Sequence, residues 1–518
     1  MGMSAADAKV LPLGDAYADV SGTDADPEKV VSRDTEAAPT GKPEIGVAEL
    51  ALEVEPDEKE QRRVLFKIDL LFLPLASLCV LFQMLDKTLL NYANLMGVKD
   101  DANLSGSEYS WLVTIFFLGY MIGTPMHAWF LQHVTLSRYV SGVMTVWGIV
   151  LMCHAACASF SAFMAVRFFL GFFEAAISPA LVLLTGRFYK RNEQVVRVLV
   201  WYSMNAWAML VGGLMSFGIL SNPPTHLHMW QEMFIAIGAC TIAFGVTNMF
   251  IMPSSPDTTW YLTERERAVA VYRIASNQSG IHDTRFKWYQ VREASLDVRL
   301  YLFFFAFATA NVVNSGINNF ASEIIAEFTS DRKRNALYGM CYGSAQVIAM
   351  FMGGSLFLWL KRRDAPSIFG YVVAIAGIAM MTWIDPVYRE ARLAGLCMAF
   401  FFPLSFPMLY SWQSNGVSGT TKRIIFNASL QIAYCVGNAA GPQAFAERDK
   451  EGGYVPAKID MLVMLAVSGV LIACVSITHW RWNQRRADNP PAYDEAEALR
   501  IALSDLTDKE RPDYKYPY

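Results

Sequence analysis

Twelve long apolar runs constrain this chain more than any other feature of its sequence. Each is long enough to cross a bilayer core, which takes about 20 mostly apolar residues in a helix. A polar stretch at residues 253–297 separates the first six runs from the last six. We therefore predict an all-α polytopic membrane protein. The runs lie near residues 69–91, 109–131, 139–158, 160–185, 197–220, 232–252, 298–321, 336–360, 367–385, 391–413, 424–446 and 459–480.

The composition favours the same class of protein. Only 17% of the 518 residues are charged and 54% are hydrophobic, whereas soluble domains carry about a quarter charged residues. The net charge of −4 and the acidic ends leave no basic patch, which argues against binding of nucleic acid. The eight cysteines lie mostly inside apolar runs, so we interpret them as helix residues and not as a metal site or disulfide framework.

The charges of the loops predict an orientation. Lys and Arg gather before the first run, after the fourth, in the central stretch, and after the eighth, tenth and twelfth. Under the positive-inside rule these loops and both termini are cytoplasmic, although Arg332, Lys333 and Arg334 would then lie outside. The expected domains are a disordered acidic cytoplasmic tail (1–63), an N-terminal six-helix bundle (64–252), a cytoplasmic central loop (253–297), a C-terminal six-helix bundle (298–482) and a cytoplasmic tail (483–518).

The ends of the sequence are polar. Residues 1–60 are acidic and low in aromatic residues, which predicts disorder, and they show no apolar region of a cleavable signal peptide. The final stretch, DLTDKERPDYKYPY, is also polar and is expected to be solvated. Asn103 begins an N-glycosylation sequon in the first predicted external loop. No nucleophile elbow, phosphate loop or metal-ligand cluster indicates an enzyme or a bound cofactor.

The first and fourth predicted spans carry four charged residues away from their ends, where charge is costly and usually functional: Asp86, Lys87, Arg167 and Glu174. Arg167 and Glu174 are two helical turns apart, so they point the same way about 10 Å apart along the axis. One interpretation is structural ion pairs, of Asp86 with Lys87 or Arg167 and of Glu174 with Arg167. The other is that an arginine grips a substrate carboxylate through two hydrogen bonds while an acid carries a proton. An ion pair that opens when substrate or proton arrives would satisfy both.

Five sequence stretches together resemble a known family. They read MLDKTLLNYANLMG, LSGSEYSWLVTIFFLGYMIGTP, RFFLGFFEAAISPA, MPSSPDTTWYLTERERAVA and SWQSNGVSGTTKRIIFNASLQIAYCVGNAAGPQAF. They are similar to the fungal allantoate-permease-like branch of the anion:cation symporters, within the major facilitator superfamily. The resemblance runs from about Lys67 to Trp482. It implies twelve transmembrane helices in two pseudo-symmetric six-helix bundles, with substrate held between them near the bilayer midplane.

The resemblance also implies an activity, which is proton-driven uptake of a small organic anion such as allantoate, nicotinate or pantothenate. It implies a monomer in the plasma membrane, with the proton as coupling ion. By motif, Arg167 would contact the substrate carboxylate, and Glu174 and Asp86 would handle protons. Tyr120 and Asn438 match positions that line the substrate cavity. Export of a pathway metabolite, or substrate sensing that signals through the tails, are alternatives that the same residues leave open.

Two departures from the family pattern stand out. The acid–base pair of the first span is usually Asp-Arg, and Lys87 cannot make the planar two-pronged contact of an arginine. Lys87 nevertheless stays a candidate substrate contact, as does Asn415 of the N-x-x-G element. The loop between the second and third spans, LQHVTLSRYV, has only Arg138 as a clearly basic residue, where the family carries several. This difference implies a divergent gating contact or reduced function.

Overall fold

The computed structural model describes residues 54, 56–222, 226–275, 286–488, 506–511 and 514–518, and all that follows concerns these residues. They form helices joined by turns, and no strand occurs among them. Most of the predicted tail 1–63 and part of the predicted tail 483–518 lie outside the described residues.

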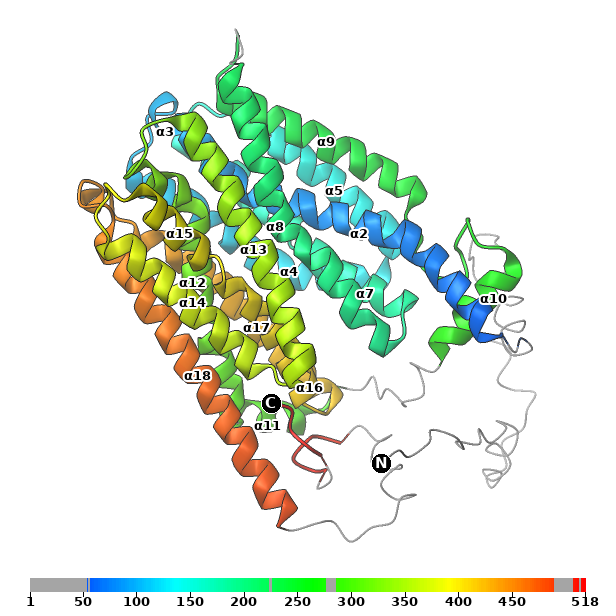
Figure 1. The fold of residues 1–518 in the computed structure, drawn as a ribbon. Helices are drawn as coiled ribbons and strands as arrows, with labels where there is room; N and C mark the ends of the chain where they lie inside the picture. The colour runs from blue at the N-terminus through cyan, green and yellow to red at the C-terminus, as the bar shows by residue number, and fades with distance from the viewer. Residues whose placement is uncertain (1–53, 55, 223–225, 276–285, 489–505, 512–513) are drawn as a thin grey trace, which may run out of the picture. The chain divides into compact units, whose positions relative to one another are not determined.

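The N-terminal half, residues 58–252, contains seven α-helices of more than ten residues (Figure 1). In this half α5 packs against α9, α4 against α6, and α2 against α8. The helices are α2 (Glu58–Leu95), α4 (Gly106–His133), α5 (Leu136–Cys153), α6 (Phe160–Glu174), α7 (Ile177–Phe188), α8 (Arg191–Ser221) and α9 (Met229–Ile251), with the short α3 (Val98–Asp101) after α2 and the 3-10 turn η2 (His154–Ala156) after α5.

The C-terminal half, residues 298–487, repeats this plan. Here α12 packs against α17 and α18, and α14 against α15 and α18. Its helices are α12 (Val298–Ala326), α13 (Arg332–Leu360), α14 (Asp364–Trp383), α15 (Arg389–Ala399), α16 (Ser405–Gly416), α17 (Thr420–Ala440) and α18 (Val455–Ala487), with the 3-10 turns η4 (Phe402–Leu404), η5 (Gly441–Ala444) and η6 (Glu447–Asp449). Between the halves lie α10 (Glu264–Ala275) and α11 (Trp288–Ser295).

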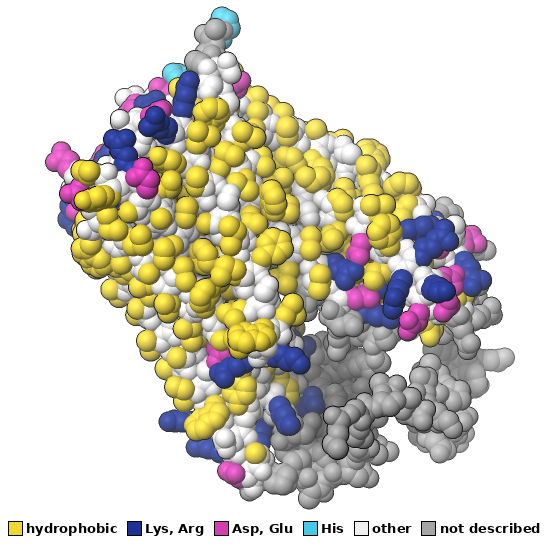
Figure 2. All heavy atoms as spheres, in the orientation of Figure 1, with side chains coloured by type: hydrophobic (Ala, Val, Ile, Leu, Met, Phe, Trp, Pro, Cys, Tyr) yellow, Lys and Arg dark blue, Asp and Glu magenta, His cyan; other side chains and the backbone are white. Residues whose placement is uncertain are grey.

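The twelve predicted crossing helices are all present. By length and apolar composition, 11 helical segments among the described residues qualify as spans, with α6 and α7 counted together and α15 and α16 counted together. The remaining helix is α17, which begins with the polar run Thr420-Thr421-Lys422-Arg423. It packs between α12 and α4, so protein and not lipid covers much of its surface. Figure 2 shows apolar side chains over the middle of the visible face, with charged ones gathered at its ends.

The two halves meet with a two-fold pattern of contacts. The first helices of the halves, α2 and α12, touch each other. The second span of each half meets the fifth span of the other, as α4 with α17 and α13 with α8. The fourth spans are interrupted in both halves, after Glu174 in one and at Phe400–Leu404 in the other. Broken helices of this kind occur where the backbone lines a cavity or is buried in protein.

Glycines set the position of α6 against α4. A Cβ on Gly171 would collide with the carbonyl oxygen of Phe116, and one on Gly119 with that of Phe168. The two backbones approach so closely that only glycine fits, as is common between membrane helices. In the C-terminal half, a Cβ on Gly437 would likewise collide with the Ala308 carbonyl of α12. These contacts fix the helices that carry the candidate site.

The structure adds detail to three of the predicted segments. Helix α2 begins at Glu58, because the polar start of this helix packs against α10, so residues 58–63 are not part of the tail. The central loop 253–297 contains α10 and α11. Residues 506–511 and 514–518 pack on the C-terminal half with Thr507, Asp508 and Tyr516 buried. The expectation of a solvated segment is wrong there, because ion pairs compensate for its burial.

The two ends of the spans are named here by their short helices. The α3 face carries α3, the α12–α13 turn and η6 (residues 97–105, 327–331 and 447–453). The α11 face carries α11, the α13–α14 and α16–α17 turns, and residues 506–511 and 514–518.

Candidate functional site

A cavity of about 80 Å³ lies between the two halves. It is lined by side chains of α2, α4, α6 and α8 on one side and of α12, α13, η4, α16 and α17 on the other. Typical ligand pockets measure about 300–1,000 Å³, so an organic ligand requires this cavity to widen. Its walls differ in chemistry, with cations on the N-terminal side and amides on the C-terminal side.

Lys87 and Glu174 form an ion pair beside the cavity. The Lys87 Nζ lies 2.8 Å from the Glu174 Oε1, and the Glu174 side chain is fully buried. The same ammonium lies 5.5 Å from the ring centre of Tyr120 and 5.9 Å from that of Tyr434, within the range of cation–π attraction. Lys87 is thus held by a carboxylate and two aromatic faces.

Arg167 is buried on α6 and lines the cavity. Among the described residues, no hydrogen-bond partner reaches its Nε or Nη2. Burying unpaired donors of a charged group costs several kcal/mol, so a site of this kind is completed by water or an anionic ligand. Two guanidinium donors are what a bidentate carboxylate contact requires.

Asp86 lies deeper than the cavity wall. The Trp147 indole N–H of α5 donates to its Oδ2, and its Oδ1 lacks a hydrogen-bond partner within the part of the chain that the structure describes. Among these residues, no ion pair within 4.0 Å joins Arg167 to Asp86 or Glu174. Glu174 forms its ion pair with Lys87 instead. The predicted pairing of Glu174 with Arg167 is therefore wrong, because Lys87 reaches Glu174 from the neighbouring helix α2.

The C-terminal wall carries a chain of amides on α12 and α17. The Asn318 amide nitrogen donates to the Asn314 Oδ1 at 3.0 Å, and that of Asn314 donates to the Asn438 Oδ1 at 2.8 Å. Asn438 in turn donates to the Asn311 Oδ1 at 2.8 Å. The Oδ1 of Asn318 is left without a donor among the described residues. This wall can accept and donate hydrogen bonds without any change of charge.

Hydrogen bonds join the halves on the α3 side of the cavity. Glu323 of α12 pairs with Lys99 of α3 and accepts a hydrogen bond from the Asn94 amide at 2.6 Å. The Tyr109 hydroxyl of α4 donates to the Asn319 carbonyl of α12 at 3.0 Å. These contacts hold the two halves together on the α3 side of the cavity.

The fold and the cavity agree with the comparison to known families. The model of the Major Facilitator Superfamily matches residues 76–442, which is more than half of the chain. The chain belongs to the major facilitator superfamily. It is therefore a membrane transporter of the facilitator type, and the expected pair of six-helix bundles is confirmed.

Several fungal facilitators are similar over most of their length. The allantoate permease of Saccharomyces cerevisiae is 30% identical over 486 residues, which cover 91% of this chain and 89% of the permease. An uncharacterized transporter of Schizosaccharomyces pombe is 32% identical over 471 residues, covering 90% and 92%. The thiamine pathway transporter of S. cerevisiae is 31% identical over 457 residues, covering 88% and 86%.

A solved facilitator structure shares the fold. A bacterial homolog of the human lysosomal transporter Spinster, in an inward-facing conformation, superposes with a TM-score of 0.58 at 15% identity. The match covers 81% of this chain and 96% of that one.

The facilitator fold brings most of the predicted site residues together. Arg167, Lys87 and Asn438 line the cavity, and Glu174 contacts Lys87. The Tyr120 ring lies near Lys87 and is tilted against the ring of Tyr434, and Asp86 is buried on α2.

Two other predicted positions lie apart from the cavity. Asn415 is exposed at the α11 face and donates to the Ser411 carbonyl at 2.8 Å, so it does not line the cavity. Asn103 is exposed in the turn before α4, with a φ of 51°, and its glycosylation stays a prediction. No group of His, Cys, Asp and Glu suited to a metal ion occurs among the residues described.

Sequence reasoning missed two polar side chains of this facilitator. Trp147 gave no signal, because an indole in an apolar run does not show which way it points. His127 could have been found, since a histidine inside a span is itself a rare polar residue. Its Nε2 lies 2.7 Å from the Phe172 carbonyl, near the end of α6, and its Nδ1 lies 2.6 Å from the Tyr139 hydroxyl. The Nε2 must carry the proton to donate to a carbonyl, so Nδ1 accepts from Tyr139.

Proposed function

We propose that this facilitator takes up a small organic anion together with protons, by alternating access between its two halves. The observation that carries the proposal is the buried Arg167, which lines the cavity between the halves and has two donor atoms without a partner among the described residues. A carboxylate would supply both acceptors in one contact.

The coupling step uses the ion pair of Lys87 and Glu174. A proton on Glu174 would cancel its charge and weaken its hold on Lys87, which lies 2.8 Å away. Lys87 then becomes available to the arriving anion, beside Arg167. When the proton leaves Glu174, the ion pair re-forms and competes with the anion for Lys87. Proton and anion therefore favour each other's binding, which is the requirement of a symporter.

The amide chain of α12 and α17 recognises the rest of the substrate. Asn314, Asn318 and Asn438 present hydrogen-bonding groups across the cavity from Arg167. A substrate with a carboxylate at one end and amide, ureido or hydroxyl groups at the other would satisfy both walls. The allantoate permease of S. cerevisiae, which is similar over most of the chain, supports such a cargo.

The protein works as a monomer in the plasma membrane, with the α11 face toward the cytoplasm. The basic residues of alternate loops support this orientation. The hydrogen bonds that join the halves on the α3 side would then favour a state closed to the exterior.

The test is uptake of labelled ureides, vitamins, sugar acids and dipeptides in a yeast host that lacks its own carriers. Initial rates are measured between external pH 4.5 and 7.5, against an empty-vector control. We expect one class of carboxylate to enter faster as the external pH falls, and to lose this dependence when a protonophore is added. An uptake rate that changes neither with external pH nor with the protonophore would contradict proton coupling. Efflux of a cell-made anion, with no uptake of any of these compounds, would identify an exporter instead.

A further inference from the structure

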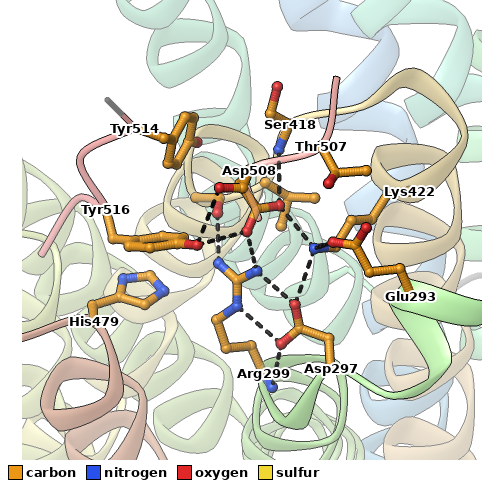
Figure 3. Close-up of polar contacts among 12 residues, drawn as sticks. Glu293, Asp297, Arg299, Ser418, Lys422, His479, Thr507, Asp508, Tyr514 and Tyr516 are labelled. Atoms are coloured by element: carbon orange, nitrogen blue, oxygen red, sulfur yellow. Dashed lines mark hydrogen bonds and ion pairs between the residues drawn. The ribbon is translucent and has the colours of Figure 1, made fainter. Parts of the chain in front are cut away.

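The last residues of the sequence fill a groove at the α11 face of the C-terminal half. Residues 506–511 and 514–518, named here the docked segment, contact α16, α17, α18 and the turn between α13 and α14. Thr507 and Asp508 are completely buried, and Tyr516 nearly so. Figure 3 shows Asp508 pointing between two cations of the bundle.

Four charged side chains form the centre of the groove, and all four are fully buried: Asp297, Arg299, Lys422 and Asp508. The Arg299 Nη2 lies 2.6 Å from a carboxylate oxygen of Asp297 and 2.6 Å from one of Asp508. The Lys422 Nζ lies 2.8 Å from Asp508 and 3.1 Å from Asp297. Two cations and two carboxylates therefore balance, and the docked segment supplies one of the carboxylates.

Removing Asp508 would leave this centre unbalanced. Among the described residues, Asp297 would then face both Arg299 and Lys422. The further carboxylate there, Glu293, lies 2.7 Å from Lys422 and is partly exposed. A buried ion pair that loses one partner is strongly destabilised, because the remaining charge stays buried without compensation. Burial raises the pKa of Asp508, but Arg299 and Lys422 outweigh it, and the net pKa lies below the usual value.

The rest of the segment is held by backbone and aromatic contacts. The Asn483 side chain of α18 pairs with both the N–H and the carbonyl of Tyr516, each at 2.9 Å. The Trp412 indole of α16 donates to the Pro517 carbonyl at 2.8 Å, and the Arg363 N–H donates to the Tyr518 carbonyl at 2.7 Å. The Tyr516 hydroxyl donates to the Asp508 Oδ2 at 2.9 Å. The main-chain contacts fix the path of the segment, and the contact of Tyr516 with Asp508 depends on its side chains.

The groove joins the helices that carry the amide wall of the cavity. Arg299 lies at the start of α12 and Lys422 at the start of α17, and these helices bear Asn314 and Asn438. Asp508 bridges the two cations. The Ser418 hydroxyl, in the turn between α16 and α17, donates to the Leu506 carbonyl at 2.9 Å. The segment thus ties together the ends of the two helices.

We propose that this groove is a binding site for a tyrosine-rich peptide that carries an aspartate, and that the docked segment fills it as a latch which holds α12, α16, α17 and α18 together as one body. Asp508 is the anchor of the latch. The stability that it confers does not depend on which substrate the protein carries, so the proposal stands apart from the proposed function.

The first test compares Asp508→Asn with Asp488→Asn in the purified full-length protein. Both changes remove one carboxylate charge, but Asp488 is exposed at the end of α18. We expect Asp508→Asn to lower the Tm by at least about 5 °C, and Asp488→Asn to change it by about 1 °C or less. Equal Tm values for the two variants would overturn the proposal.

The second test supplies the segment in trans. A chain that ends at residue 505 is purified and mixed with a fluorescent peptide of residues 506–518. We expect saturable binding, a rise of Tm toward that of the full chain, and at least about tenfold weaker binding of the Asp508→Asn peptide. Equal affinities of the wild-type and Asp508→Asn peptides would contradict the role of Asp508 as the anchor. If the shortened chain does not fold, the full-length comparison above decides.

Discussion

The two halves of this transporter share one plan but divide the chemistry of the cavity between them. The N-terminal half places four ionisable side chains in or behind the cavity wall: Asp86, Lys87, Arg167 and Glu174. The C-terminal half lines the same cavity with asparagines and keeps ion pairs at the two faces, with the partly buried Glu323 on one side and the buried Arg299 and Lys422 on the other. The two halves therefore share one fold but form cavity walls of different chemistry.

The difference indicates a division of labour. A wall of carboxylates and cations can change its charge when a proton binds, whereas a wall of amides cannot. We infer that the N-terminal wall couples the proton to the anion and that the C-terminal wall selects the shape and polar groups of the substrate. The predictions that follow would break or sharpen this contrast.

The largest effect is expected at Arg167. Arg167→Lys keeps the charge but loses the planar pair of donors, so kcat/KM for uptake should fall about 100-fold. Arg448→Lys is the matched control, because Arg448 is exposed at the α3 face. Labelled uptake, corrected for protein at the membrane, measures both. Unchanged uptake in Arg167→Lys would contradict the assignment of the anion site to the N-terminal wall.

A smaller effect is expected where α6 packs on α4. Gly171→Ala would push the α6 backbone away from Phe116 and displace Arg167 and Glu174 together. Uptake should fall about tenfold, since a displacement of about 1 Å at a binding site costs one to two orders of magnitude. Gly142→Ala on α5 is the control, because a Cβ there meets nothing within 4 Å. If both glycines tolerate alanine equally, close packing does not position the charged wall.

The amide wall should respond differently from the charged wall. Asn438→Ala removes the link between Asn314 and Asn311, and we expect KM to rise about five- to tenfold while the pH profile keeps its shape. Asn415→Ala, at an exposed position outside the cavity, should leave KM unchanged. A shifted pH profile in Asn438→Ala would show that the two walls are not separate.

The smallest effect concerns the aromatic support of Lys87. Tyr120→Phe keeps the ring 5.5 Å from the ammonium and should change uptake by less than about twofold. Tyr120→Leu removes the ring and should cost about three- to fivefold, in line with the energy of a partly buried cation–π contact. Equal rates in both variants would mean that the ring contributes only packing.

The sequence predicted the fold because apolar length reports directly on membrane crossing. Even α17, whose start is too polar to qualify as a span, was found as an apolar run between turns. Helical spacing also placed Arg167 and Glu174 on one side of their span. Helical spacing could not show that Lys87 of another helix would form an ion pair with Glu174, because such pairs depend on how the helices are rotated against each other.

The docked segment shows where composition misleads. Its polar residues predict solvation, and no periodic pattern marks Asp508 as buried. The partners that compensate its charge, Arg299 and Lys422, lie far away in the sequence. Burial of a charge is decided by such distant partners, so it becomes visible only in the folded chain.

Proton movement driven by substrate tests the division of labour most directly. Purified protein is placed in liposomes with an internal pH dye, and substrate is added outside without a pH gradient. We predict internal acidification with the wild type and with Glu451→Gln, an exposed control, and none with Glu174→Gln, although that variant still exchanges labelled substrate. Acidification by Glu174→Gln at the wild-type rate would contradict the assignment of proton coupling to the N-terminal half.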